Sequence, residues 1–176
     1  MKVDEQCRVQ NLLGALSIGV SDRIQAKAAE CVGHAGETAA ALVQIGTTPR
    51  MSIEELSDAL SLSHSAVVRL VAKLTGMEFI ERVTGEDKRE VRLVLTRGGK
   101  ATLKRIQGAR SEILASLMDG LSSKDVLVLG KMLESMLSRI ALTQKEAVHV
   151  CRYCQEDECP QDRCPTRPME QVDAAE

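Results

Sequence analysis

The sequence predicts a mainly α-helical α+β fold, in which a winged helix-turn-helix with a small β-hairpin lies between long N- and C-terminal helices. Two capped helical segments follow each other closely between residues 52 and 76, and two short alternating segments come next, between residues 79 and 95. The chain has one Phe, one Tyr and no Trp, so its core must be aliphatic, which suits packed helices. Its 176 residues suffice for one ordinary domain, or for one domain plus a small appendage.

Residues 1–49 are expected to form N-terminal dimerisation and support helices. A long helix is predicted over 8–33, where apolar residues recur three and four positions apart: Leu13, Leu16, Val20, Ile24, Ala28 and Cys31. Gly14 and Gly19 each weaken this helix by roughly 1 kcal/mol relative to Ala, so packing against other elements must support it. A shorter apolar helix is predicted over 37–45.

Residues 50–101 contain the predicted helix-turn-helix. Ser52 and Glu55 form a capping box at the start of its first helix, Ser63 is the N-cap of the second, and Gly76 is expected to cap the second helix at its end. The second helix carries an apolar stripe made of Ala66, Val67, Leu70, Val71 and Leu74. Its other side presents Ser63, His64, Ser65, Val68, Arg69 and Lys73. A helix with an apolar back and a polar, cationic front is the form that enters a DNA major groove.

A β-hairpin is predicted directly after this helix. Phe79–Val83 gives one strand and Val91–Leu95, with alternating apolar residues, gives its partner. Residues 84–89 between them are too polar to bury and are expected to form an exposed tip. This hairpin is the predicted wing, and its candidate DNA-binding residues are Asp87, Lys88 and Arg89.

The distribution of charge supports a nucleic-acid-binding segment. The whole chain has 23 basic and 25 acidic residues, a net charge of −2. Residues 50–110, however, contain 12 Lys and Arg against 8 Asp and Glu, whereas the rest of the chain contains 11 against 17. Positive charge is therefore concentrated in the predicted winged domain.

Residues 102–149 are expected to form C-terminal dimerisation helices. Thr96 is the predicted cap of a helix over 97–118, and another is predicted over 124–149. Their apolar positions are Leu103, Ile106, Ile113, Leu114, Leu117, Val126, Leu129, Leu133, Met136, Leu137 and Ile140. A small winged domain cannot cover this much apolar surface. We therefore expect the terminal helices to pack on each other and on a second copy, as a homodimer; packing within one chain is the alternative.

The helix Ser63–Leu74, the Asp-x-Arg tip and the run VRLVLTRGGKA at 91–101 resemble the MarR family of transcriptional regulators, over about residues 8–148. The resemblance implies a homodimer that binds pseudo-palindromic operators in double-stranded DNA. It implies that Arg89 reaches the minor groove, oriented by Asp87 through a charge-assisted hydrogen bond. It also implies that the major groove is read by Ser63, His64, Ser65, Val68 and Arg69. Family members often sense small phenolic ligands, so a small-molecule effector is expected as well.

Residues 150–176 form a cysteine-rich tail, whose spacing C-x2-C-x4-C-x4-C is set by Cys151, Cys154, Cys159 and Cys164. Four thiolates in so short a segment suit a tetrahedral metal site, and zinc is the favoured metal. An iron–sulfur cluster is the second choice, because Cys-Pro pairs occur at 159–160 and 164–165. Free or reversibly oxidised thiols are the third. Such tight loops bury no core, so a metal would have to supply their folding energy.

The identity of the metal would decide the role of the tail. Zinc would be structural or would be displaced by oxidants, whereas a cluster would sense redox state or iron. His149 competes as a ligand because it lies two residues before Cys151. Cys31 is expected in the core, and nothing visibly activates Cys7.

No enzyme motif is present in the sequence: there is no Gly-rich phosphate loop, no nucleophile elbow and no His/Asp pair with a candidate Ser. No run of 18 apolar residues predicts a membrane span. The N-terminus lacks the layout of a secretion signal, so a cytoplasmic location is expected. The alternative to a DNA-binding regulator is a metal-dependent redox or adaptor protein whose winged domain binds protein.

Overall fold

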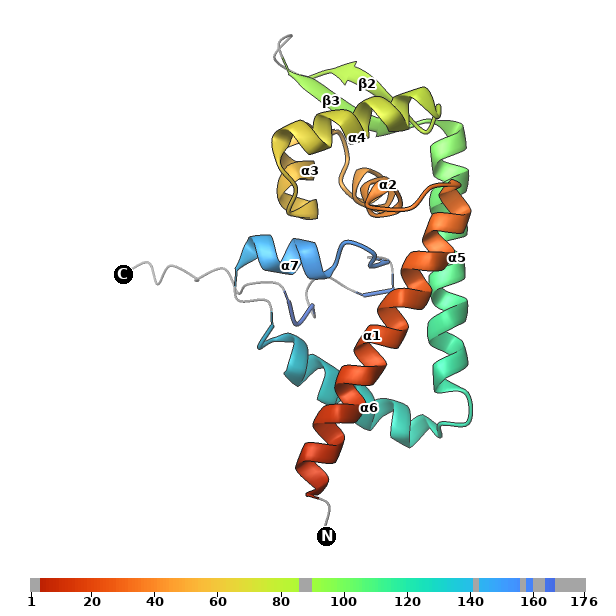
Figure 1. The fold of residues 1–176 in the computed structure, drawn as a ribbon, viewed down its shortest axis with the longest axis vertical. Coiled ribbons are helices and arrows are strands. Elements are labelled where there is room, and N and C mark those ends of the chain that lie inside the picture. Colours follow the sequence, from red (N-terminus) through yellow and green to blue (C-terminus); the bar gives the residue numbers. More distant parts are fainter. Residues whose placement is uncertain (1–3, 86–89, 141–142, 156–157, 160–163, 167–176) are drawn as a thin grey trace, which may run out of the picture.

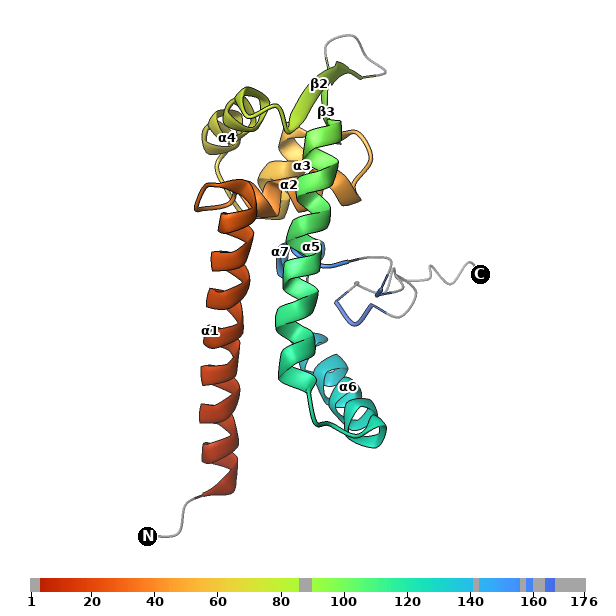
Figure 2. The same cartoon turned by 90° about the vertical axis from the view of Figure 1, so that its right-hand side faces the viewer.

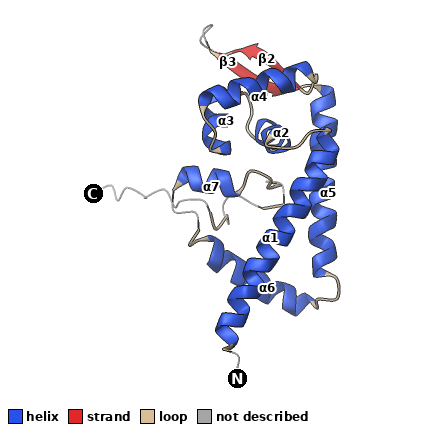
Figure 3. Cartoon of the chain, viewed as in Figure 1, coloured by secondary structure: helices blue, strands red, loops and turns tan. Residues whose placement is uncertain are grey.

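The computed structural model describes residues 4–85, 90–140, 143–155, 158–159 and 164–166. Its elements in chain order are α1 (Glu5–Val32), α2 (Thr38–Thr47), β1 (Met51–Ser52), α3 (Ile53–Leu60), α4 (His64–Gly76), β2 (Ile80–Thr84), β3 (Val91–Leu95), α5 (Arg97–Met118), α6 (Ser123–Leu137) and α7 (Gln144–Val150). The winged domain lies at one end of the long helices α1 and α5, and α6 lies at the other (Figures 1 and 2). A helical chain with one small antiparallel sheet confirms the predicted α+β fold class (Figure 3).

The longest helix, α1, begins at an Asp4 cap, whose carboxylate accepts a hydrogen bond from the Gln6 N–H at 3.1 Å. It packs against α5 and α2. Its buried residues, Ala28 and Val32, lie near its C-terminal end. The predicted apolar stripe is therefore exposed at Leu13 and Leu16, and it is half-buried or buried from Val20 onward. Neither α1 nor any other helix in the described residues is long and apolar enough to cross a membrane.

The core lies where the winged domain meets α2 and the ends of α1 and α5, and it centres on α2, where every residue from Thr38 to Ile45 is buried. Around it, α3, α4, β3 and α5 each contribute large side chains that are almost fully buried: Leu56, Val67, Val71, Leu74, Leu93 and Ile106. Cys31, expected in the core, is half-buried and packs against this cluster. The aliphatic composition thus yields one contiguous core.

The sheet has three antiparallel strands in the order β1-β3-β2. The hairpin pairs Ile80 with Leu95 and Thr84 with Val91, close to the predicted strands. The two-residue strand β1 is an addition that the sequence does not predict, and it pairs Met51 with Leu93 and Ser52 with Arg92. Since Ser52 also caps α3, β3 is joined directly to the start of the helix-turn-helix.

The junction between the hairpin and α5 is tightly packed. Thr96 caps α5 by accepting a hydrogen bond from the Gly99 N–H at 3.0 Å, and its hydroxyl donates to the Glu78 carbonyl at 2.6 Å. A Cβ at Gly99 would collide with the Phe79 backbone carbonyl. Glycine at this position therefore allows α5 to begin against the loop that leads into β2.

Two expectations for helix ends were wrong. Gly76 is the last residue of α4 rather than its cap; Met77 caps the helix and Glu78 takes the left-handed conformation, with φ of 59°. The helix expected over 124–149 is two helices, α6 and α7, because Thr143 and Glu146 form a capping box that begins a new helix. This second helix packs against α3 instead of extending α6.

Candidate nucleic-acid interface and cysteine pocket

The second helix of the helix-turn-helix, α4, has one buried and one exposed face. Its buried face consists of Val67, Val71 and Leu74, each 0% exposed. The Ser63 hydroxyl caps the helix by accepting a hydrogen bond from the Ala66 N–H at 3.3 Å. The opposite face presents the predicted groove-facing side chains, Ser63, His64, Ser65, Val68 and Arg69, all of them exposed, with Lys73 half-buried in the last turn. The exposed face of α4 is therefore polar and cationic.

The wing is described at its base only. The backbone N–H of Gly85 donates to the Glu90 carbonyl at 2.8 Å and closes the end of the hairpin. The three predicted contacts at the tip, Asp87, Lys88 and Arg89, lie outside the described residues.

Two arginines that the sequence analysis missed link the wing to the helix-turn-helix. Arg92 on β3 places Nη2 2.8 Å from Glu90 Oε2 and Nη1 3.4 Å from Glu55 Oε2. Arg50 donates from Nη2 to the Thr84 carbonyl at 2.6 Å. The backbone N–H of Ser52, with a smaller contribution from Arg92, holds the pKa of Glu55 below its usual value. The capping carboxylate is therefore shared between α3 and the wing.

Apolar side chains remain exposed on three of the long helices. Leu12, Leu16 and Ile18 on α1 are 53%, 54% and 66% exposed. The other large apolar residues exposed on α1, α5 and α6 are Val9, Leu13, Leu117, Met118, Val126, Leu127, Val128, Met132, Leu133 and Met136. Large apolar side chains exposed in such number are typical of an interaction surface.

The four tail cysteines line one cavity of about 290 Å³. Its wall is completed by Gln44 and Thr48 from α2, by Gln144, Ala147 and Val148 from α7, and by Thr166. The Thr166 hydroxyl lies 3.2 Å from Cys151 Sγ and 3.1 Å from Cys164 Sγ. Among the described residues, no three His, Cys, Asp or Glu side chains are arranged to hold a metal ion. The cavity thus gathers the predicted ligands without forming a finished metal site.

The thiols differ in how readily they ionise. A hydrogen bond from the Cys154 thiol, opposed by burial and aided by bonds from Thr166 and Cys164, lowers the pKa of Cys151 to about 6. The same hydrogen bond raises the pKa of Cys154, and burial raises that of Cys159. Since the thiolate is the form that binds metals, Cys151 is the first donor available.

His149, the competing ligand, points away from this cavity. Its Nδ1 lies 3.3 Å from the Ala59 carbonyl on α3, and it is not among the residues that line the cavity. Another cavity, of about 540 Å³, lies where α2, β3 and α5 meet, and Arg50, Lys100 and Lys104 contribute to its wall.

This arrangement defines a class of protein: a winged helix-turn-helix carried on long terminal helices. Residues 38–91 match the model of the MarR family. Proteins of that family are transcription regulators and not enzymes, and the match supports the prediction that this chain is not an enzyme. No curated protein matches the sequence.

Solved structures of this class share the fold across most of the chain. YusO from Bacillus subtilis is 20% identical, with a TM-score of 0.64 over 77% of this chain and 97% of its own. FabT from Streptococcus pneumoniae, solved in complex with DNA, is 23% identical, with a TM-score of 0.62 over 76% and 94%. MepR, a transcription regulator of the Staphylococcus aureus multidrug efflux pump MepA, is 18% identical, with a TM-score of 0.63 over 74% and 96%. The fold is therefore MarR-like.

Proposed function

We propose that this protein is a homodimeric, sequence-specific DNA-binding transcriptional regulator that represses genes by occupying a pseudo-palindromic operator. The observation that carries the proposal is the two-faced helix α4, with Val67, Val71 and Leu74 buried and its polar, cationic side exposed. The MarR family match over 38–91 supports it, as does the complex of FabT with DNA. In this proposal α4 enters the major groove and Arg89 enters the minor groove.

The dimer would be formed by the terminal helices. Exposed apolar residues on α1 and α6, such as Ile18 and Leu127, are 66% and 69% accessible in one chain. A two-fold interface between copies would bury them and place two α4 helices on one face of a duplex. Two half-sites one helical turn apart would then be read together.

Operator binding can be tested with a duplex selected by the protein from a random library and measured by fluorescence anisotropy. For six to ten phosphate contacts, affinity is expected to fall by roughly 10³- to 10⁵-fold between about 50 and 200 mM salt. A selection that recovers no preferred sequence, or binding that ignores salt, would favour the alternative of a redox or adaptor protein whose winged domain binds protein.

Two substitutions distinguish base reading from backbone contact. Arg69→Ala should change which bases are preferred at one position of each half-site, at a cost of about 1–3 kcal/mol, if Arg69 contacts base edges. An equal loss on all sequences would reduce Arg69 to a phosphate contact. Arg89→Ala should weaken binding, and unchanged affinity would remove the wing assignment. Arg23→Ala on the exposed side of α1 is the control and should leave affinity unchanged.

We also propose that Cys151, Cys154, Cys159 and Cys164 bind zinc, with an iron–sulfur cluster as the second candidate. Their shared cavity and the low pKa of Cys151 support a soft-metal site. The thiols would have to draw together around the ion, as metal-dependent loops do. Metal analysis and a visible spectrum of anaerobically purified protein test this. We expect one zinc per chain and a colourless protein. Iron with acid-labile sulfide would instead show that the site holds an iron–sulfur cluster.

A small-molecule or redox effector is the remaining part of the proposal. The 540 Å³ cavity beside β3 has room for a small ligand, and Arg50, Lys100 and Lys104 would favour an anionic one. A redox effector would instead act at the four thiols.

A further inference from the structure

We infer that Zn²⁺ bound in the cavity lined by Cys151, Cys154, Cys159 and Cys164, here called the cysteine pocket, increases the affinity for DNA. We call the pocket a clasp, because the segment from α7 to Gln155 contacts both the helix-turn-helix and α5 and holds the two together. This inference rests on the proposed DNA-binding function and names a regulatory input for it. Four parts of the structure carry it: the wall shared with α2, the contacts with α3, the contacts with the start of α2, and the contact with α5.

The pocket is built directly on the core of the winged domain. Gln44 and Thr48 of α2 form one side of it, and Gln44 is only 6% exposed. α2 packs against α3, β3 and α5. A structural change in the pocket therefore acts directly on the helix at the centre of the core.

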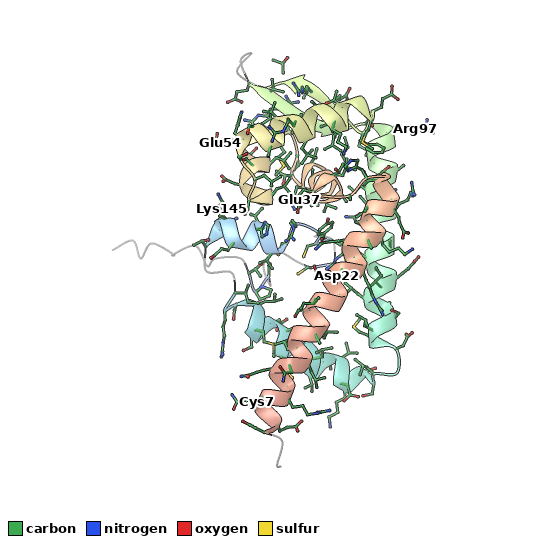
Figure 4. All side chains as sticks on the ribbon, in the orientation of Figure 1. Cys7, Asp22, Glu37, Glu54, Arg97 and Lys145 are labelled. Atoms are coloured by element: carbon green, nitrogen blue, oxygen red, sulfur yellow. The ribbon has the colours of Figure 1, made fainter. Side chains whose placement is uncertain are left out.

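The helix that leads into the pocket, α7, packs against the first helix of the helix-turn-helix. Lys145 Nζ lies 2.9 Å from Asp58 Oδ1, and His149 Nδ1 lies 3.3 Å from the Ala59 carbonyl. Figure 4 shows Lys145 on α7 facing the end of α3. Ala147 between them is 5% exposed. Because α3 packs in turn on α4, a single helix separates α7 from the proposed recognition helix.

The residues between Cys151 and Cys154 contact the start of α2. Arg152 Nε lies 3.9 Å from Glu37 Oε2, and both atoms are buried with no hydrogen-bond partner in the described residues. The Arg152 guanidinium also lies 5.8 Å from the centroid of the Tyr153 ring, which packs against the core. Cys151 and Cys154, both candidate metal ligands, therefore lie on either side of Arg152 and Tyr153.

Gln155, the residue after Cys154, contacts α5, which belongs to the proposed dimerisation helices and is here called the arm. Ser111 on α5 donates a hydrogen bond to Gln155 Oε1 at 2.7 Å. The stretch from Gln144 to Gln155 therefore contacts α3, α2 and α5 in turn, and connects the DNA-reading part of the molecule to the arm.

Zinc would strengthen this connection at the cysteine pocket. The far side of the pocket is attached through Thr166, which is 3% exposed and contacts the Cys151 and Cys164 thiols. Binding of Zn²⁺ would replace these contacts by metal–thiolate bonds, with the thiol protons released to solvent. A braced winged domain holds the two α4 helices of a dimer at one spacing, and such preorganisation raises affinity. Zinc removal is therefore expected to weaken operator binding.

The experiment uses the full-length chain, with zinc, after chelation, and after zinc is added back. Hydrogen exchange should show faster exchange in α2 and α3 after chelation, restored by Zn²⁺. Affinity for the selected duplex, measured by anisotropy, should fall at least about tenfold and recover. Light scattering should show the same oligomeric state throughout.

Matched variants separate metal loss from general damage. Cys159→Ser should bind operator as weakly as the chelated protein and fail to respond to added zinc. Cys7→Ser is the control, since Cys7 is exposed at the N-terminal end of α1 (Figure 4) and does not line the pocket, and it should respond like the unaltered protein. Arg152→Gln combined with Tyr153→Phe should retain zinc while losing most of the effect of chelation on affinity.

The outcomes separate the clasp from the proposed function. Any one of three results would overturn the clasp. These are hydrogen exchange in α2 and α3 that does not change on chelation, a protein that binds no zinc, and a DNA-binding protein whose operator affinity does not change on chelation. Zinc-dependent exchange in a protein that selects no duplex would overturn the DNA-binding function and leave the bracing intact.

Discussion

Arg92 links the wing to the helix-turn-helix through two carboxylates. Its guanidinium, 28% exposed, lies between Glu90 on its own strand and Glu55 in the capping box of α3. Partly exposed pairs contribute about 0.2–1 kcal/mol each, so Arg92→Ala should lower the free energy of unfolding by about 1 kcal/mol, measured by urea denaturation. Arg92→Lys should recover less than half of this, because an ammonium cannot bridge both carboxylates. A loss of equal size in Arg82→Ala, on the exposed side of β2, would contradict this role.

Single residues were predictable from the sequence where their partners are local. Ser52 with Glu55, Ser63 and Thr96 all cap helices as expected, since each contacts a backbone group within three residues. Arg92 pairs with Glu55 of α3, 37 positions away, and Lys145 pairs with Asp58 of α3, 87 positions away. No local sequence pattern predicts such pairs. The exposed face of α4 was predicted for the same local reason, because helical periodicity alone divides the two faces.

At the level of elements, the junction of the hairpin with α5 depends on a missing side chain. Gly99→Ala would place a Cβ against the Phe79 carbonyl. The helix start or the loop before β2 must then shift, so we expect the free energy of unfolding to fall by about 2 kcal/mol or more. Gly108→Ala, also on α5 but with nothing near its Cβ position, should instead raise it by up to about 1 kcal/mol. Thermal denaturation of both variants tests this, and equal effects would contradict the packing argument.

The elements that were misjudged have either an overlooked local signal or limits that depend on distant contacts. The apolar repeat continues from Val126 to Ile140, so periodicity alone gave one helix where the chain forms α6 and α7. The capping box of Thr143 and Glu146 was a local signal that could have located the break. Strand β1 has two residues and exists because Met51 pairs with Leu93. The position of the cysteine pocket against α2 is likewise a tertiary feature that spacing does not encode.

At the level of the whole molecule, the apolar side chains exposed on α1, α5 and α6 are the reason for proposing a dimer. In the proposed dimer this surface sets the distance between the two α4 helices, so a charge placed on it should abolish operator binding without touching the winged domain. Leu127→Glu changes a residue of α6 that is 69% exposed in one chain. Burying an unpaired carboxylate in a dimer interface is strongly unfavourable, so we expect the dimer dissociation constant to rise at least about 100-fold, measured by sedimentation. Operator affinity should fall in parallel, because each half-site alone binds weakly.

Leu127→Met keeps the side chain apolar and should retain both properties. Leu127→Glu protein that stayed dimeric would place the interface elsewhere, whereas a folded monomer with full operator affinity would show that one winged domain is sufficient.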